Sequence, residues 1–84
     1  MAGEELAQRF GELARRLRQE KGLTQERVGE ISGLHRNYIG AIERAERTPS
    51  IVAADKLAKA LGTTLAKLFT ELEQGSDDAA PIKR

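Results

Sequence analysis

Hydrophobic residues recur every three or four positions in five stretches of the chain, a spacing that predicts helices rather than strands. The first stretch, about residues 5–21, ends at Gly22, and polar residues cover the side opposite its apolar stripe. That stripe consists of Leu6, Phe10, Leu13, Ala14 and Leu17. We therefore expect an amphipathic packing helix, preceded by a few frayed residues at the N-terminus.

Residues 24–49 then contain two short helical patterns separated by a glycine. Thr24 can cap the first of these helices, because its hydroxyl can accept a hydrogen bond from a free N–H group of the first turn. The helix is expected to bury Val28 and Ile31. It should end at Gly33, which can adopt the left-handed conformation common at helix C-termini.

The second short helix is expected at about residues 36–44, with its apolar side packed back onto the first helix. This apolar side consists of Leu34, Tyr38, Ile39 and Ile42. Two helices joined by a short glycine-containing turn form a helix-turn-helix, whose second helix can enter the major groove of DNA. The opposite side, which we expect to be exposed, consists of Arg36, Asn37, Gly40, Ala41 and Arg44.

Several residue types on that exposed side suit DNA binding. The guanidinium of Arg36 can donate to guanine O6 and N7, and the amide of Asn37 can pair with adenine N6 and N7. Ala41 is small enough to approach a thymine methyl group. Gln25, at the start of the first short helix, can donate to a phosphate with help from the helix N-terminus.

Three neighbouring residues have two interpretations each. Arg44 and Arg47 can hold DNA phosphates, or they can be ordinary surface charges. Tyr38 can pack in the core with its hydroxyl at the surface, or it can contact DNA. The sequence leaves these alternatives open.

Two further helices follow the central segment. Pro49 prevents continuation of the preceding helix, and Ser50 can cap the next one, over residues 51–61. Its buried side is expected to contain Ile51, Ala54, Leu57, Ala58 and Leu61. Gly62 should end this helix, and Thr64 should cap the last one.

The last helix has a larger apolar side than packing within one small domain requires. We therefore expect Leu65, Phe69 and Leu72 to contact a second copy of the chain. From these patterns we predict a compact all-α fold of five helices, with a DNA-binding domain over residues 1–74 that includes the dimerisation helix. Residues 75–84 lack periodicity and carry mixed charges, which predicts a disordered tail.

Residues 10–69 resemble the helix-turn-helix proteins of the Xre family, to which the phage Cro and repressor proteins belong. The resemblance rests on LTQE, the turn glycine, YI followed by IER, the TP after the second helix and a closing LF. Within the family, the segment LHRNYIGAIER is most similar to the controller proteins of restriction–modification systems. The resemblance implies a phosphate contact by Gln25, base contacts by Arg36, Asn37 and Ala41, and a structural ion pair between Arg18 and Glu43.

The chain departs from the family pattern at three positions. Gly29 stands where alanine is usual, and this change weakens the helix by up to about 1 kcal/mol. His35 replaces the usual serine or threonine cap of the second helix and should be a poorer cap. Ala45 stands where the family usually has glycine.

Composition excludes several classes of protein. The 84 residues suffice for one small domain, for which dimerisation is a plausible source of stability. The absence of cysteine leaves no disulfide framework and fits a cytoplasmic location. The sequence contains neither an apolar run long enough to span a membrane nor a signal peptide. The net charge is only +1, but the segment from Arg9 to Arg47 contains nine basic residues and six acidic ones.

We expect no enzymatic activity, cofactor, metal site or small-molecule effector. A phosphate-binding loop, a nucleophile paired with a base and a carboxylate cluster are all missing from the sequence, and the single His35 cannot form a metal site. The sequence thus predicts a homodimeric transcriptional regulator that binds double-stranded DNA at a pseudo-palindromic operator. The alternative is a helical protein-interaction module, such as an antitoxin, in which DNA binding is secondary.

Overall fold

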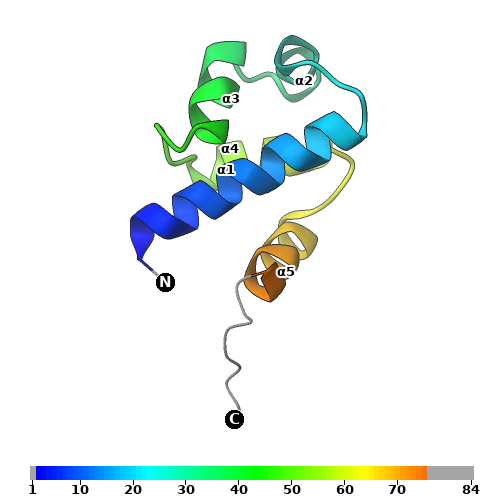
Figure 1. Cartoon of the computed structure of the whole chain (residues 1–84). Coiled ribbons are helices and arrows are strands. Elements are labelled where there is room, and N and C mark those ends of the chain that lie inside the picture. Colours follow the sequence, from blue (N-terminus) through cyan, green and yellow to red (C-terminus); the bar gives the residue numbers. More distant parts are fainter. Residues whose placement is uncertain (1, 76–84) are drawn as a thin grey trace.

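The computed structural model describes residues 2–75, which form five α-helices and no strand (Figure 1). The helices are α1 (Gly3–Glu20), α2 (Gln25–Ser32), α3 (Arg36–Glu43), α4 (Ile51–Ala60) and α5 (Leu65–Gly75). The predicted all-helical fold is confirmed, although α1 begins two residues earlier than expected. Of the predicted tail, only Gly75 lies within the described residues, where it ends α5. None of the described helices is long and apolar enough to cross a membrane.

Side chains cap the helices that position the central motif. The Thr24 hydroxyl accepts a hydrogen bond from the Arg27 N–H at 2.9 Å, and the Ser50 hydroxyl accepts one from the Ala53 N–H at 3.0 Å. At the start of α3, Nδ1 of His35 accepts a hydrogen bond from the Asn37 N–H, also at 3.0 Å. His35 therefore provides a cap, although histidine is rarely chosen for this position.

Three helices end in the same type of turn. After α1, α3 and α4, an N–H group bonds back across five residues to a carbonyl in the last turn, as in a Schellman motif. The residue in the left-handed conformation is Gly22 after α1 and Gly62 after α4, with φ of 70° and 78°. After α3 it is Ala45, with φ of 63°, the one non-glycine residue in residues 2–75 with positive φ. The turn after the second helix of the motif therefore carries strain that the other two avoid.

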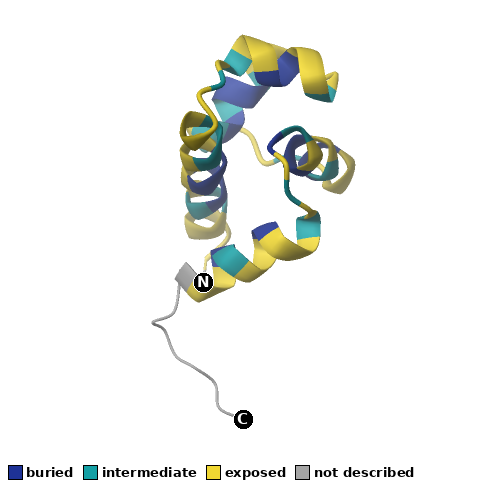
Figure 2. Ribbon diagram, turned by 90° about the vertical axis from the view of Figure 1, so that its right-hand side faces the viewer, coloured by how far each residue is buried: buried dark blue, intermediate teal, exposed yellow. Residues whose placement is uncertain are grey.

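All five helices contribute to the hydrophobic core (Figure 2), with α1 packed against α3 and α5, and α2 packed against α3 and α4. In Figure 1, α1 runs across the molecule with α2 and α3 on one side and α5 on the other. The largest fully buried side chains come from α2, α3, α4 and α5: Val28, Ile39, Ile42, Leu57 and Leu68. The core holds α3 from one side, and the opposite side of α3 is not covered by it.

Three residues that we expected in the core are exposed instead. Ile31 is 48% exposed, because the buried face of α2 is centred between Val28 and Gly29 and Ile31 lies beyond its edge. Leu6 and Ile51 are 43% and 78% exposed. Both lie in the first turn or two of their helices, where the chain reaches past the core. The expectation that these three are buried was wrong.

A glycine permits the close packing of α1 on α3. Gly11 is buried, and a β-carbon at this position would lie 2.4 Å from the carbonyl oxygen of Ile42 and 2.8 Å from that of Glu43. These distances are shorter than any normal carbon–oxygen contact. Only glycine at this position lets α1 approach the C-terminal end of α3 so closely, and this approach brings Arg18 near Glu43.

Candidate nucleic-acid interface

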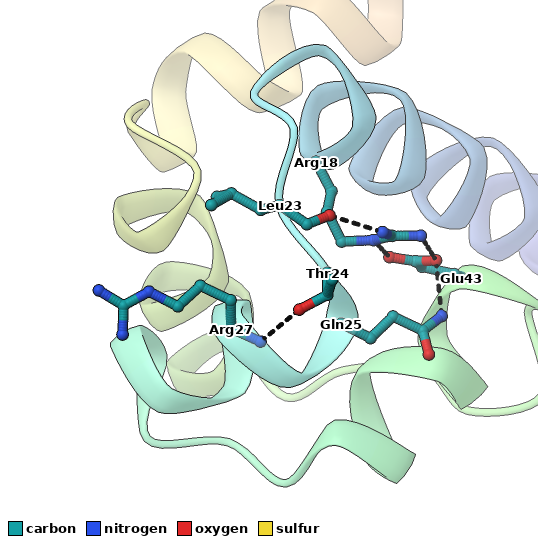
Figure 3. A network of polar contacts seen from close by, with 6 residues as sticks. All are labelled: Arg18, Leu23, Thr24, Gln25, Arg27 and Glu43. Carbon is teal, nitrogen blue, oxygen red and sulfur yellow. Dashed lines mark hydrogen bonds and ion pairs between the residues drawn. The ribbon is translucent and has the colours of Figure 1, made fainter.

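A half-buried polar network joins α1, the start of α2 and the end of α3 (Figure 3). Arg18 donates from Nε to Oε2 of Glu43 at 2.7 Å and from Nη2 to Oε1 at 3.0 Å, so the pair is bidentate. Its third donor, Nη1, bonds to the carbonyl oxygen of Leu23 at 2.8 Å. The side chains of Arg18 and Glu43 are only 13% and 4% exposed. The structure thus brings together the two residues that the family resemblance implied would pair.

Gln25 belongs to the same network. Its Nε2 donates to Oε1 of Glu43 at 3.0 Å, and Figure 3 shows this bond between the start of α2 and the end of α3. This bond uses one of the two amide hydrogens, so the other can still be donated elsewhere. Gln25 is therefore held at the N-terminal end of α2, where a phosphate would also meet the helix dipole.

Gly40 lies beneath that amide. We expected it on the exposed side of α3, but it is buried, and a β-carbon there would lie 3.0 Å from Nη1 of Arg44 and 3.3 Å from Oε1 of Gln25. Because these two side chains cover it, Gly40 cannot present itself to a base. Its role is to make room for Gln25, and the expectation of an exposed Gly40 is corrected.

Arg36 and Asn37 project from the first turn of α3 and are exposed. Among residues 2–75, the Asn37 side chain has no hydrogen-bond partner, although its backbone N–H is capped by His35. Arg36 has one loose partner, because its Nη1 lies 3.7 Å from Oε1 of Glu26 and both side chains are more than 60% exposed. The guanidinium donors of Arg36 and the amide donor and acceptor of Asn37 are thus available to a ligand.

Tyr38 and Arg47 contact each other. The Arg47 guanidinium carbon lies 5.2 Å from the centre of the Tyr38 ring, a cation–π geometry. Tyr38 is half-buried and also packs against the core, while Arg47 is exposed. Ala41, the remaining predicted base contact, is half-buried on the same helix. Tyr38 therefore packs against the core and keeps part of its surface exposed, and its contact with DNA stays a prediction.

Arg44 forms an ion pair that sequence reasoning missed. Its Nε and Nη2 donate to the two carboxylate oxygens of Glu46 at 3.0 and 3.1 Å. These hydrogen bonds, with the attraction between the charges, lower the pKa of Glu46 and raise that of Arg44. A spacing of two residues does not predict contact on a helix. Arg44 and Glu46 nevertheless meet, because the turn at Ala45 folds the chain back toward α3.

The three residues predicted for a dimer interface differ in their exposure. Leu72 is buried in the core of the monomer and Leu65 packs against it, whereas Phe69 is 44% exposed. The Phe69 ring lies 6.5 Å from that of Phe10, at the side of an apolar groove of about 1020 Å³. Leu6 and Ile51 also line this groove. Leu72 thus has little surface left to offer a second copy, and Phe69 has the most.

Nothing in the described part of the chain resembles a metal centre, because no three His, Asp or Glu side chains lie close enough together to hold an ion. The residues predicted to contact DNA lie at the start of α2, along α3 and in the turn after α3. We call this surface the α3 face; it consists of Gln25, Arg36, Asn37, Tyr38, Ala41, Arg44 and Arg47.

Comparison with known proteins gives a consistent result. A family model described as helix-turn-helix matches residues 15–68. The control protein C.SmaI of Serratia marcescens is 48% identical over 61 residues, which are 73% of each chain. The crystal structure of the restriction-modification controller protein C.AhdI from Aeromonas hydrophila is 44% identical, with a TM-score of 0.72 over 75% of this chain and 96% of that one.

One similar structure also contains DNA. It is a tetramer of the restriction-modification controller protein C.Esp1396I in complex with its natural 35 base-pair operator. That protein is 30% identical, with a TM-score of 0.76, and the match covers 86% of this chain and 92% of the other. The resemblance to controller proteins that the sequence indicated is therefore confirmed.

Proposed function

The chain belongs to the helix-turn-helix family, and we infer that it regulates transcription by binding a specific DNA sequence as a homodimer. Its mode of action is occupancy of an operator rather than chemistry. The cytoplasm is where such a protein meets its DNA.

The observation that carries this proposal is the contrast between the two sides of α3. On the buried side, Ile39, Ile42 and Glu43 hold the helix against α1 and α2. On the other side, Arg36 and Asn37 are exposed and nearly free of partners. A rigid helix that presents such donors and acceptors can place them against base edges with little loss of conformational entropy.

Each residue of the α3 face has a proposed role. Arg36 donates to guanine O6 and N7, Asn37 pairs with adenine, and Ala41 lies against a thymine methyl group. Gln25, Arg44 and Arg47 contact phosphates on either side of the groove, and Tyr38 supports Arg47 from the core side. Phosphate contacts fix the position of the protein on the duplex, and base contacts select the sequence.

A single α3 covers only a few base pairs, so specific binding needs two copies. We propose that the dimer forms through α5 and the apolar groove beside it, with Phe69 at the centre. In a symmetric dimer the two α3 helices would lie about one turn of DNA apart, roughly 34 Å, and would contact the two halves of an inverted repeat.

The test is selection of binding sites from random duplex DNA with the purified protein, followed by sequencing. Enrichment of an inverted repeat with half-sites about one helical turn apart would support the proposal and reveal the operator. A single half-site would support DNA binding but contradict the dimer. No enrichment over the starting pool would refute the proposal and favour a protein-interaction module.

A further inference from the structure

Two arginines of the α3 face lie next to a carboxylate, which is unfavourable for a surface that should attract DNA. Arg36 lies 3.7 Å from Glu26, a loose contact, whereas Arg44 donates from both Nε and Nη2 to the carboxylate of Glu46. Of the two carboxylates, Glu46 therefore restricts its arginine more, and that arginine, Arg44, is one that we assign to phosphate binding.

The fold does not require the side chain of Glu46. Its backbone N–H donates to the carbonyl oxygen of Ala41 at 2.8 Å and closes the turn after α3, but any residue other than proline supplies that bond. Its side chain is 59% exposed and bonds only to Arg44 among the described residues. An exposed ion pair of this kind contributes little to stability. The carboxylate can thus be removed without loss of the fold.

The same carboxylate competes with DNA. Arg44 can bind a phosphate only if it leaves Glu46 or shares its donors with both groups. Once DNA is bound, Glu46 also lies near the phosphate and repels it. An exposed glutamate is ionised at neutral pH, and the hydrogen bonds with Arg44 lower the pKa of Glu46 further.

We propose that Glu46 is an intramolecular competitor for Arg44 and thereby sets the protein concentration at which the chain occupies DNA. The proposal rests on the proposed function, because it assumes that the α3 face binds DNA. The competing contact is with a phosphate, which every duplex offers. Glu46 therefore weakens binding to all sequences alike and leaves base preference unchanged.

The experiment compares the wild type with the variants Glu46→Gln, Arg44→Ala and the double variant. Fluorescence anisotropy would measure their affinity for the selected operator and for a random duplex of equal length, over a range of salt concentrations. Glu46→Gln should bind both duplexes about two- to fivefold more tightly. The dependence of its affinity on salt should steepen by about one counterion, because Arg44 becomes free to neutralise a phosphate.

The double variant tests whether the effect acts through Arg44. In the Arg44→Ala background, Glu46→Gln should lose most of its gain. A full gain in that background would show that Glu46 acts by general repulsion and would overturn the proposal. A gain on the operator alone would also overturn it, because Arg44 would then contact a base.

A matched control separates this effect from a change in net charge. Glu20→Gln removes the same charge from an exposed carboxylate on α1, 3.4 Å from Arg16, and should change affinity less than twofold. Melting curves should show that Glu46→Gln folds like the wild type. If the wild type binds DNA and Glu46→Gln binds no more tightly, only this inference fails. If the wild type binds no duplex, the proposed function fails as well.

Discussion

Gly11 and Ile42 are in contact through the backbone, with no room for a side chain between α1 and α3. Gly11→Ala would place a β-carbon 2.4 Å from the Ile42 carbonyl oxygen, and two rigid helices must separate to relieve this overlap. We expect the free energy of unfolding to fall by about 1–3 kcal/mol, measured by urea denaturation. Gly3→Ala is the control, because a β-carbon there has no atom within 4 Å and alanine favours helix. Equal stability of the two variants would contradict the close approach.

The Arg18–Glu43 ion pair leads to a second prediction. Arg18→Met should lower the free energy of unfolding by about 3–5 kcal/mol, because it leaves the carboxylate of Glu43 buried without its partner. Arg18→Met combined with Glu43→Leu should recover much of this loss, since no charge is then buried alone. Chemical denaturation of the single and double variants would measure both effects. Additive losses in the double variant would show that the two residues act independently.

Base contact and phosphate contact should be distinguishable by mutation. Arg36→Ala should weaken operator binding by about 1–3 kcal/mol and relax the preference at one base pair. Arg47→Ala should weaken binding to all sequences alike and reduce the salt dependence by about one counterion. Both effects are measured with the selected operator, its single-base variants and random DNA. An equal loss on operator and random DNA for Arg36→Ala would remove Arg36 from the base-contacting residues.

A substitution in the turn after α3 should make the protein more stable. Ala45 adopts φ of 63°, where an L-residue is strained and glycine is not. Ala45→Gly should therefore raise the free energy of unfolding by up to about 1 kcal/mol, after allowance for the greater freedom of glycine in the unfolded chain. Gly22→Ala is the reciprocal test, because Gly22 has the same turn and open space around it, and it should be destabilising. Thermal melts of both variants would show opposite shifts.

The dimer interface can be tested at Phe69. Phe69→Glu should give a monomer that binds a full operator poorly, because burying the introduced charge against a second copy is costly. Gel filtration with light scattering measures the mass, and circular dichroism verifies that the monomer still folds. Thr70→Glu places the same charge on the next, exposed residue and should remain dimeric. A dimer that survives Phe69→Glu would place the interface elsewhere.

Local signals made most of the fold predictable. Thr24 and Ser50 mark helix starts by their hydroxyls, and Gly22, Gly33 and Gly62 mark helix ends by their left-handed conformation. Each of these depends only on residues nearby in sequence. The bounds of α2, α3 and α4 therefore differ from prediction by at most one residue.

What could not be predicted depends on packing between distant segments. A short helix has few turns to fix its buried face, so Ile31 and Ile51 were placed on the wrong side. The role of Gly11 depends on how α1 crosses α3, which periodicity does not specify. The Arg44–Glu46 pair was missed because it arises from a turn and not from helical spacing. The family resemblance alone indicated that Arg18 and Glu43 would meet.

The fold does not depend on the side chains of Arg36 and Asn37, since α3 is held by Ile39, Ile42 and Glu43. Two positions can therefore diverge between duplicated copies of such a chain while the scaffold stays the same. A cell with several copies could keep their target sites separate through these two side chains. The same separation makes α3 a suitable place to graft the specificity of one relative onto another.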